Sequence, residues 1–314
     1  MAKRMYMKAL FLLTVLLTCL GLQSVSGSGP NLDAPQLSFV SDRDGKSAIY
    51  AMNLDGSVQT PLLDFGSRIR NQAWSPDGKQ LAFSADYHGN TDIFIINVDC
   101  EGAIEPDCVS TPTNLTETVS DDIEPAWSSD GDKIAFRSGR GDDFLWNIFF
   151  IELQESRLTQ VITDFNDFAP TWSPDGTRLA VQSLREGNWE IYVMDLDGSN
   201  PVRLTNHIAF DYRPRWSPDG SKIAFDSFRD GNWEIYVRDV DCNSSESDCI
   251  QNLTHHEAND GGAAWSPDGS QLAFTSDREG NFEIYTMDSD GTNVVRLTRN
   301  ESNDTEPSWR TLSG

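Results

Sequence analysis

The chain has 314 residues and a formal net charge of −25 at pH 7. A negative charge of this size repels nucleic acid and anionic lipid, which excludes both as direct partners.

The first predicted element in chain order is a secretory signal peptide, residues 1–27. Lys3, Arg4 and Lys8 form its positive region. The apolar stretch 9–22 follows, and small residues after it suit cleavage. Removal of the peptide takes the net charge from −25 to −28, because three basic residues and no acidic one are lost. No later stretch is apolar and long enough to span a bilayer, so we expect a periplasmic or secreted protein.

From Leu37 onwards one sequence unit occurs six times. Close copies include "IAFDSFRDGNWEIYVRDVDC" at 223–242 and "LAFTSDREGNFEIYTMDSDG" at 272–291. Each unit is associated with a tryptophan marker, and successive markers are 44 to 53 residues apart, the period of a four-stranded propeller blade. The markers are Trp74, Trp127, Trp172, Trp216, Trp265 and Trp309.

Four extended runs can be recognised within a unit, each bounded by Gly, Pro, Asp or Asn. Around Trp216 they are "PRWS", "KIAFDS", "WEIYVRD" and "IQNLT", which we name strands A to D with A innermost. The "SPDG" between A and B is typical of a tight hairpin turn, because Pro presets the first corner and Gly takes the positive φ. No stretch has helical periodicity of useful length, so we predict an all-β fold.

The two ends of the repeat array are both incomplete. The last marker, in "EPSWRTLSG", has no "PDG" after it, and the first copy has no Trp before it. Pairing these two remnants makes one whole blade and removes the open edges of an unclosed array. We therefore predict one domain, residues 28–314, that forms a six-bladed β-propeller of four-stranded antiparallel blades. Its first blade is completed by residues 303–310.

The unit "WSPDG…IAF.S.R.G..EIY.MD.DG….RLT" resembles the repeat of the TolB-type, WD-like β-propellers. The resemblance covers almost all of the chain after the signal, in six copies. In TolB itself a separate α/β domain precedes the propeller, whereas here the first strand follows the signal almost at once. The resemblance therefore implies a propeller without that domain. TolB-like propellers dock a lipoprotein partner at one face, so it also implies a protein-binding role.

Strand directions alternate within a blade, so the B–C turn and the loop from D to the next A lie at one end, which we call the top face. Five units have an Asp five residues before the Trp and an Arg in the B–C turn, 18 positions apart within a continuous unit. The second unit loses both, with Ile69 and Tyr87 in their places. This joint change predicts structural ion pairs, because a planar guanidinium suits a carboxylate; a ring of Asp that binds cations is the alternative. The predicted pairs are Asp304–Arg43, Asp122–Arg140, Asp167–Arg185, Asp211–Arg229 and Asp260–Arg278.

Four of the five cysteines form two local pairs at the C–D hairpins of blades 2 and 5. Four cysteines allow three pairings, but each blade holds one pair, so we predict the disulfides Cys100–Cys108 and Cys242–Cys249. Disulfides agree with an exported, oxidising location. The fifth, Cys19, lies in the signal; a lipoprotein would use it, although the residues before it suit that poorly.

The sequence offers little for catalysis. The histidines at positions 88, 207, 255 and 256 share no metal-binding spacing on one strand, and no Ser lies in a Gly-x-Ser-x-Gly elbow. We expect no catalytic residues, no metal site and no cofactor. The enzyme alternative is a calcium-dependent, lactonase-like hydrolase whose ligands would converge in the central tunnel. Its candidates, each three residues before a Trp marker, are Asn71, Glu124 and Glu306.

Residues that the repeat does not require gather on the predicted top face. An apolar and aromatic loop with arginines precedes strand A of blade 5, and His pairs or Tyr–His pairs occur near blades 6 and 2. Such a patch on a polyanion is typical of a recognition surface; the alternative is that its apolar residues only cover the blade top. The candidates are His207, Ile208, Phe210, Tyr212, Arg213, Arg215, His255, His256, Tyr87 and His88.

From these observations we predict an exported, non-catalytic binding propeller. Its top face would dock a protein or another component of the cell envelope. A carbohydrate-binding role stays open, because tryptophans and carboxylates suit sugars, and we expect a monomer.

Overall fold

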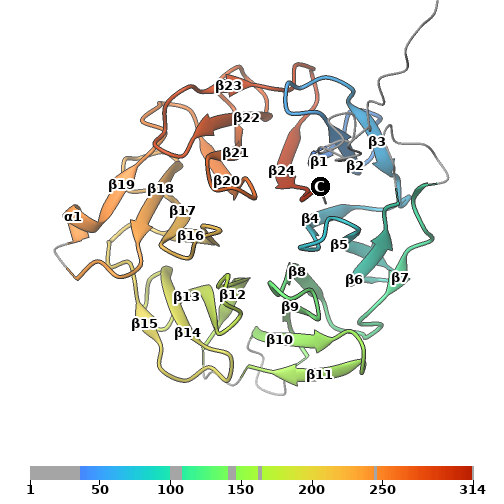
Figure 1. Cartoon of the computed structure of the whole chain (residues 1–314), viewed down its shortest axis with the longest axis horizontal. Helices are drawn as coiled ribbons and strands as arrows, with labels where there is room; N and C mark the ends of the chain where they lie inside the picture. Colours follow the sequence, from blue (N-terminus) through green and yellow to red (C-terminus); the bar gives the residue numbers. More distant parts are fainter. Residues whose placement is uncertain (1–35, 100–107, 141–145, 162–164, 244–245, 313–314) are drawn as a thin grey trace, which may run out of the picture.

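Six four-stranded antiparallel sheets surround a central axis in the computed structural model of the protein (Figure 1). The structure describes residues 36–99, 108–140, 146–161, 165–243 and 246–312. The strands are given from the axis outwards. Blade 1 contains β24 (Asp304–Trp309), β1 (Leu37–Ser41), β2 (Ala48–Met52) and β3 (Thr60–Leu63). Blade 2 contains β4 (Ile69–Trp74), β5 (Gln80–Tyr87), β6 (Asn90–Asn97) and β7 (Thr113–Asn114), and blade 3 contains β8 (Asp122–Trp127), β9 (Lys133–Ser138), β10 (Asn147–Glu152) and β11 (Arg157–Gln160). Blade 4 contains β12 (Asp167–Trp172), β13 (Arg178–Ser183), β14 (Glu190–Asp195) and β15 (Val202–Arg203). Blade 5 contains β16 (Asp211–Trp216), β17 (Lys222–Ser227), β18 (Glu234–Asp239) and β19 (Ile250–Asn252). Blade 6 contains β20 (Asp260–Trp265), β21 (Gln271–Ser276), β22 (Glu283–Asp288) and β23 (Val295–Arg296).

This arrangement confirms the predicted six-bladed all-β propeller. The helix α1 (Glu246–Cys249) lies in the hairpin between β18 and β19. A disulfide joins Cys242 to Cys249 across that hairpin, with an S–S distance of 2.01 Å, as predicted. Cys100 of the other predicted disulfide lies outside the described residues, as does the predicted signal peptide. Within the described ranges there is no helix with the length and apolar character needed to cross a membrane.

The two ends of the repeat array meet in the first blade. β24 pairs antiparallel with β1, and the register places Trp309 opposite Leu37 and Asp304 opposite Ser41. The final strand in the chain therefore lies at the axis, inside the first one (Figure 1). This confirms the predicted closure of the ring, and it leaves β1 with a hydrogen-bonded neighbour on each side.

Arg310 fastens the closed blade to blade 2. It replaces the Ser that follows the other Trp markers, and only 9% of it is exposed. Its Nε donates to the carbonyl of Gly78 at 2.8 Å, its Nη2 donates to the carbonyl of Val98 at 3.3 Å, and its guanidinium lies 4.9 Å from the Trp74 ring. Gly78 has no room for a side chain, because a Cβ there would lie 1.8 Å from the carbonyl oxygen of Thr311.

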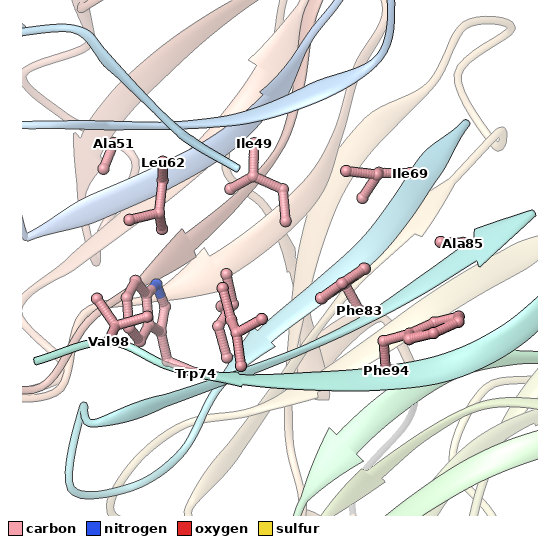
Figure 2. Packing of buried hydrophobic residues seen from close by; sticks show 11 residues of the cluster. Ile49, Ala51, Leu62, Ile69, Trp74, Phe83, Ala85, Phe94 and Val98 are labelled. Atoms are coloured by element: carbon pink, nitrogen blue, oxygen red, sulfur yellow. The ribbon is translucent and has the colours of Figure 1, made fainter. Parts of the chain in front are cut away.

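The hydrophobic core is divided into six clusters, each shared by two neighbouring blades. Figure 2 shows the cluster between blades 1 and 2, where Ile49 and Leu62 face Trp74, Phe83 and Phe94. Burial of one such side chain stabilises the fold by about 1.5–3 kcal/mol. Because each cluster needs both blades, no blade buries its apolar faces by itself.

The marker tryptophans add hydrogen bonds between blades. In four blades the indole Nε1 donates to a carbonyl on the innermost strand of the preceding blade, as from Trp127 to Ala73 at 3.0 Å. Between blades 2 and 1 the link passes through a hydroxyl group. Trp74 Nε1 donates to Ser38 Oγ at 2.8 Å, and that hydroxyl donates to the carbonyl of Ser308 at 3.3 Å. The marker positions are therefore contacts between blades as well as core residues.

Deletion of residues 303–314 should abolish the single cooperative unfolding transition of the protein. The deletion removes β24 and Arg310 together, which exposes an edge of β1 and apolar surface of both neighbouring blades. Thermal unfolding followed by circular dichroism measures this, with a chain that ends at Leu312 as the control. An unchanged melting temperature after the longer deletion would show that the ring is not needed.

Candidate functional site

The five predicted Asp–Arg pairs are ion pairs in the structure. The carboxylates, on the first residue of each innermost strand except β4, are fully buried, and they lie 2.6 to 3.1 Å from an Arg Nη2. In each pair the Arg Nε also donates to the Ser Oγ two residues earlier, at 2.8 to 2.9 Å. The guanidinium packs over a ring of the third strand, as Arg229 does over Tyr236 at 4.6 Å. Each pair thus joins three strands of one blade.

Blade 2 replaces this ion pair with apolar packing. Ile69, at the Asp position, is 1% exposed, and Ala85, at the Ser position, is fully buried. Tyr87, at the Arg position, packs on Phe94 with ring centroids 5.5 Å apart. An apolar set can replace a buried ion pair without loss of stability, which explains why the three residues change together.

The innermost strands share an irregular residue three positions before each Trp. Its φ is positive, between 49° and 65°, in all six blades, and only one of the six is Gly. The register with the second strand shifts at the same place. Left-handed backbone is unfavourable for side chains other than Gly, so the surrounding structure must hold it. The residues are Asn71, Glu124, Ala169, Arg213, Gly262 and Glu306.

The N–H of each irregular residue is bonded to a side chain of the preceding blade. In four cases the acceptor belongs to the second-strand residue just before the Ser position of the repeat, which is Ala85 in blade 2. It is Ser84, Gln182, Asp226 or Thr275, at 2.8 to 3.2 Å.

The two remaining blades have no acceptor at that position, because the residue is Val40 or Arg137. There a glutamate on the innermost strand takes over. Glu306 Oε2 accepts from the N–H of Asn71, and Glu124 Oε2 accepts from the N–H of Ala169 at 2.8 Å. A glutamate thus occurs on the innermost strand of a blade whose second-strand position has no side-chain oxygen.

Two of the three tunnel candidates, Glu124 and Glu306, therefore have a structural role. Each glutamate carboxylate is bonded to backbone of the next blade, and Glu124 Oε2 also lies 3.5 Å from Arg137 Nε. Burial raises the pKa of Glu306. A calcium ion needs several oxygens that are free to coordinate it. No group of three or more His, Cys, Asp or Glu is placed to hold a metal within the described part of the chain.

Arg213 and Arg215 lie on the innermost strand β16 and not on the loop before it. Arg213 Nη1 is 3.1 Å from Asp226 Oδ2, although 61% of its side chain stays exposed. Arg215 is half-buried and next to the last residue of β16, so it is far along the strand from the top face. β16 already begins at Asp211 and carries the chain away from that face, so Arg215 lies apart from the loop residues with which the sequence grouped it.

Seven aromatic rings form a continuous strip across the top ends of blades 3 to 5. Neighbouring ring centroids lie 4.8 to 6.3 Å apart, which is the range of favourable aromatic pairs. The Arg137 guanidinium packs on the end of the strip, 4.2 Å from the ring of Phe168. We call these residues the aromatic strip: Trp146, Phe168, Trp189, Tyr212, Phe210, Trp233 and Phe228.

The repeat does not require the strip. The repeat position of Trp146, Trp189 and Trp233 holds Phe282 in blade 6, but it is Ser47 in blade 1 and Thr91 in blade 2. Ile208, beside the strip in the loop before β16, is 93% exposed, and Phe210 is 47% exposed. In the described part of the chain all exposed aromatic residues lie at this face: Tyr87, Phe165, Phe210, Phe228 and Phe282.

The structure brings together only some of the residues predicted for recognition. His207, Ile208 and Phe210 lie in one loop, and Phe210 stacks on Tyr212 at 5.9 Å. The sequence candidates did not include five of the seven strip residues: Trp146, Phe168, Trp189, Phe228 and Trp233. Comparison of one repeat position across the six units would have found the three tryptophans. On blade 2, the rings of Tyr87 and His88 stack at 4.0 Å, and they have no ring contact with the strip within the described residues.

His255 and His256 lie over blade 5, whereas the sequence had suggested blade 6. The N–H of His256 donates to Glu234 Oε1 at 3.0 Å, which folds the loop after β19 back onto β18. Both histidines line a pocket of about 420 Å³ that opens at the top face. Its other lining residues are Asp230, Glu234, Tyr236 and Asn252.

Comparison with known proteins agrees with this architecture. The profile of the TolB beta propeller domain matches residues 146–251 and 244–312, more than half of the chain. The chain belongs to the TolB β-propeller family. A TolB homologue from Chlorobium chlorochromatii is 31% identical over 139 residues, which make up 44% of this TolB β-propeller and 28% of that protein. An uncharacterized protein from Agrobacterium fabrum is 34% identical over 112 residues, 36% of this chain and 35% of the other.

The matches to these curated relatives thus span about a third of their length or less. Among solved structures, TolB from Acinetobacter baumannii has a TM-score of 0.73 with 21% identity, over 89% of this TolB β-propeller and 67% of that chain. At this identity the likeness shows the fold.

Replacement of Arg229 by Ala should destabilise the fold by about 3 kcal/mol at neutral pH, because it leaves a buried carboxylate without its cation. Burial raises the pKa of Asp211 to about 6, and Arg229 opposes that rise. In the variant the pKa rises further, so stability keeps falling with pH above 6, where the parent has levelled off. Chemical denaturation at pH 5 and pH 8 should give the larger loss at pH 8; an equal loss would contradict the raised pKa.

Glu306→Ala should lower the free energy of unfolding by about 1–3 kcal/mol, because the N–H of Asn71 in blade 2 loses its acceptor in blade 1. Val40→Thr places a hydroxyl where Thr275 serves the next blade, with little change in side-chain volume. Added to Glu306→Ala, it should recover part of the loss. The measurement is a double-mutant cycle by denaturation, with Val40→Thr alone as control. Additive effects would show that residue 40 cannot replace Glu306 as the acceptor of the Asn71 N–H.

Proposed function

We propose that this TolB β-propeller is an exported, non-catalytic binding module whose top face docks a partner protein. The aromatic strip carries the proposal. It joins rings of three blades into one surface, and the repeat itself does not need them, as Ser47 and Thr91 show. Trp and Tyr dominate the binding energy of protein interfaces, and exposed apolar patches mark such interfaces.

The composition of the surface favours a protein over a sugar. The strip continues into Ile208 and Phe210, whose exposed aliphatic and aromatic surface suits the apolar centre of a protein interface. The net negative charge disfavours nucleic acid and anionic lipid.

A periplasmic or secreted location is part of the proposal. It is supported by the signal pattern in residues 1–27 and by the disulfide between Cys242 and Cys249, since disulfides persist in oxidising compartments. The resemblance to TolB-like propellers points to a protein of the cell envelope as the partner.

Substitution of Ile208 and Phe210 by Ser should weaken partner binding at least about 30-fold, the effect of losing an interface anchor worth about 2 kcal/mol. Both side chains are exposed in a loop, so the fold should be unaffected. The protein would first be used to capture partners from an envelope extract. Dissociation constants of the purified partner would then be measured for parent and variant.

The matched control is Val202→Ser with Val295→Ser, which removes two exposed apolar side chains from the outer strands β15 and β23. We expect the control to bind as the parent does. If parent, variant and control retain the same proteins, the top face does not dock them. Binding of glycans that depends on the strip, without any protein partner, would replace the proposal by a carbohydrate-binding module.

A further inference from the structure

Blades 4 and 6 each hold an arginine at a position where blade 5 does not. Arg203 on β15 and Arg296 on β23 occupy the same place in the outermost strand, opposite a tyrosine of the third strand. In blade 5 the same register position, opposite Tyr236, is Asn252. The three blades can therefore be compared atom by atom.

In blade 4 the arginine fills an acidic site at the top end of β14. Arg203 Nη2 donates to Glu190 Oε1 at 2.8 Å, and Nη1 donates to Glu186 Oε2 at 2.5 Å. The Nε donates to the carbonyl of Thr205 at 2.7 Å. Glu190 is fully buried, so the guanidinium neutralises a charge that has no access to water.

Blade 6 repeats this arrangement. Arg296 Nη2 donates to the fully buried Glu283 at 2.9 Å, and its Nε donates to the carbonyl of Thr298 at 2.8 Å. Its Nη1 lies 4.0 Å from Glu279 Oε2. The site thus holds a guanidinium in the same way in two separate blades.

Blade 5 keeps the acids but lacks the guanidinium. Glu234, at the position of Glu190, is 2% exposed, and it receives only uncharged donors such as the N–H of His256 at 3.0 Å. Among the residues that the structure describes it forms no ion pair, whereas its counterparts in blades 4 and 6 do. The Asn252 amide is too short to reach it and binds Asp230 at 2.9 Å instead.

The space that the arginine would fill is the pocket of about 420 Å³ lined by Asp230, Glu234 and Asn252. Within the described ranges no cation pairs with Glu234 in place of the missing one, and the Arg229 guanidinium, which lies over Tyr236, is paired with Asp211. The His256 ring accepts a hydrogen bond at Nδ1 from the N–H of Ala258 at 3.0 Å, so this nitrogen does not donate to Glu234.

We propose that this pocket binds the guanidinium of an arginine side chain that the partner protein presents. The inference rests on the proposed docking function and adds the chemistry of one contact. Glu234 lies at the bottom of the pocket and Asp230 at its rim, as Glu190 and Glu186 do around Arg203. A planar guanidinium can bind both carboxylates at once, whereas a lysine ammonium is a single point charge.

The pocket residues are neighbours of the aromatic strip along the chain. Phe228 and Trp233 of the strip flank Asp230 in the B–C turn, and Trp233 directly precedes Glu234. A partner that covers the strip therefore brings its own residues to the pocket mouth. An arginine buried between the two proteins would be an anchor of the kind found at interface centres.

The test introduces into blade 5 the arginine that blades 4 and 6 have at the same position. Asn252→Arg should fill the pocket with an internal guanidinium, raise the melting temperature and lower the affinity for the partner at least about ten-fold. Asn252→Gln, which adds length without charge, is the matched control and should bind within about three-fold of the parent. Retained partner affinity in Asn252→Arg would overturn the arginine pocket while leaving docking through the strip intact.

Probe peptides test the ligand chemistry without the partner. Calorimetry with Ac-Gly-Arg-Gly-amide should show one site, and the citrulline peptide, which has the same shape without the charge, should bind at least about ten-fold more weakly. Arg203→Asn should open a second site and change the stoichiometry from one to two. If no arginine peptide binds the parent at millimolar concentration, the inference is wrong. Tight binding of free arginine, with partner capture unchanged by Asn252→Arg, would overturn it in favour of a small-molecule site.

Discussion

The structure depends on one constraint: a blade can bury its apolar faces only against its two neighbours. All six hydrophobic clusters combine residues of adjacent blades, so every blade is stabilised from both sides or not at all. Closure at the seam is therefore as important as any single core. Here β24 pairs with β1, and Arg310 extends under Trp74 to the carbonyl groups of blade 2.

The same dependence explains why residues vary in groups. The N–H of an irregular residue in one blade must find an oxygen in the preceding one, so Val40 occurs with Glu306 and Arg137 with Glu124. Blade 2 exchanges an Asp, an Arg and a Ser together for an apolar set. Charged residues near the axis of a propeller can thus be part of its framework, and their oxygens cannot be counted as free ligands until their backbone partners are known.

The period of the repeat, its four strands, the closure and the Cys242–Cys249 disulfide could be predicted because they depend on contacts within one unit or between its ends. The irregular residues could not, since nothing in Glu124 or Arg213 by itself indicates a positive φ. The aromatic strip was also missed, because its contacts join residues of different units, such as Trp189 and Tyr212. The site of His256 depends on how a loop folds back over its own blade.

The seam also sets the order of events when the protein is made. Of the strands that form the six blades, β24 is synthesised last, although it belongs at the axis of the first blade. Until it emerges, β1 has an unpaired edge and the first and last blades expose apolar surface, both of which favour pairing with other chains. The chain therefore passes through an open stage, in which association with other chains competes with the addition of β24 to β1.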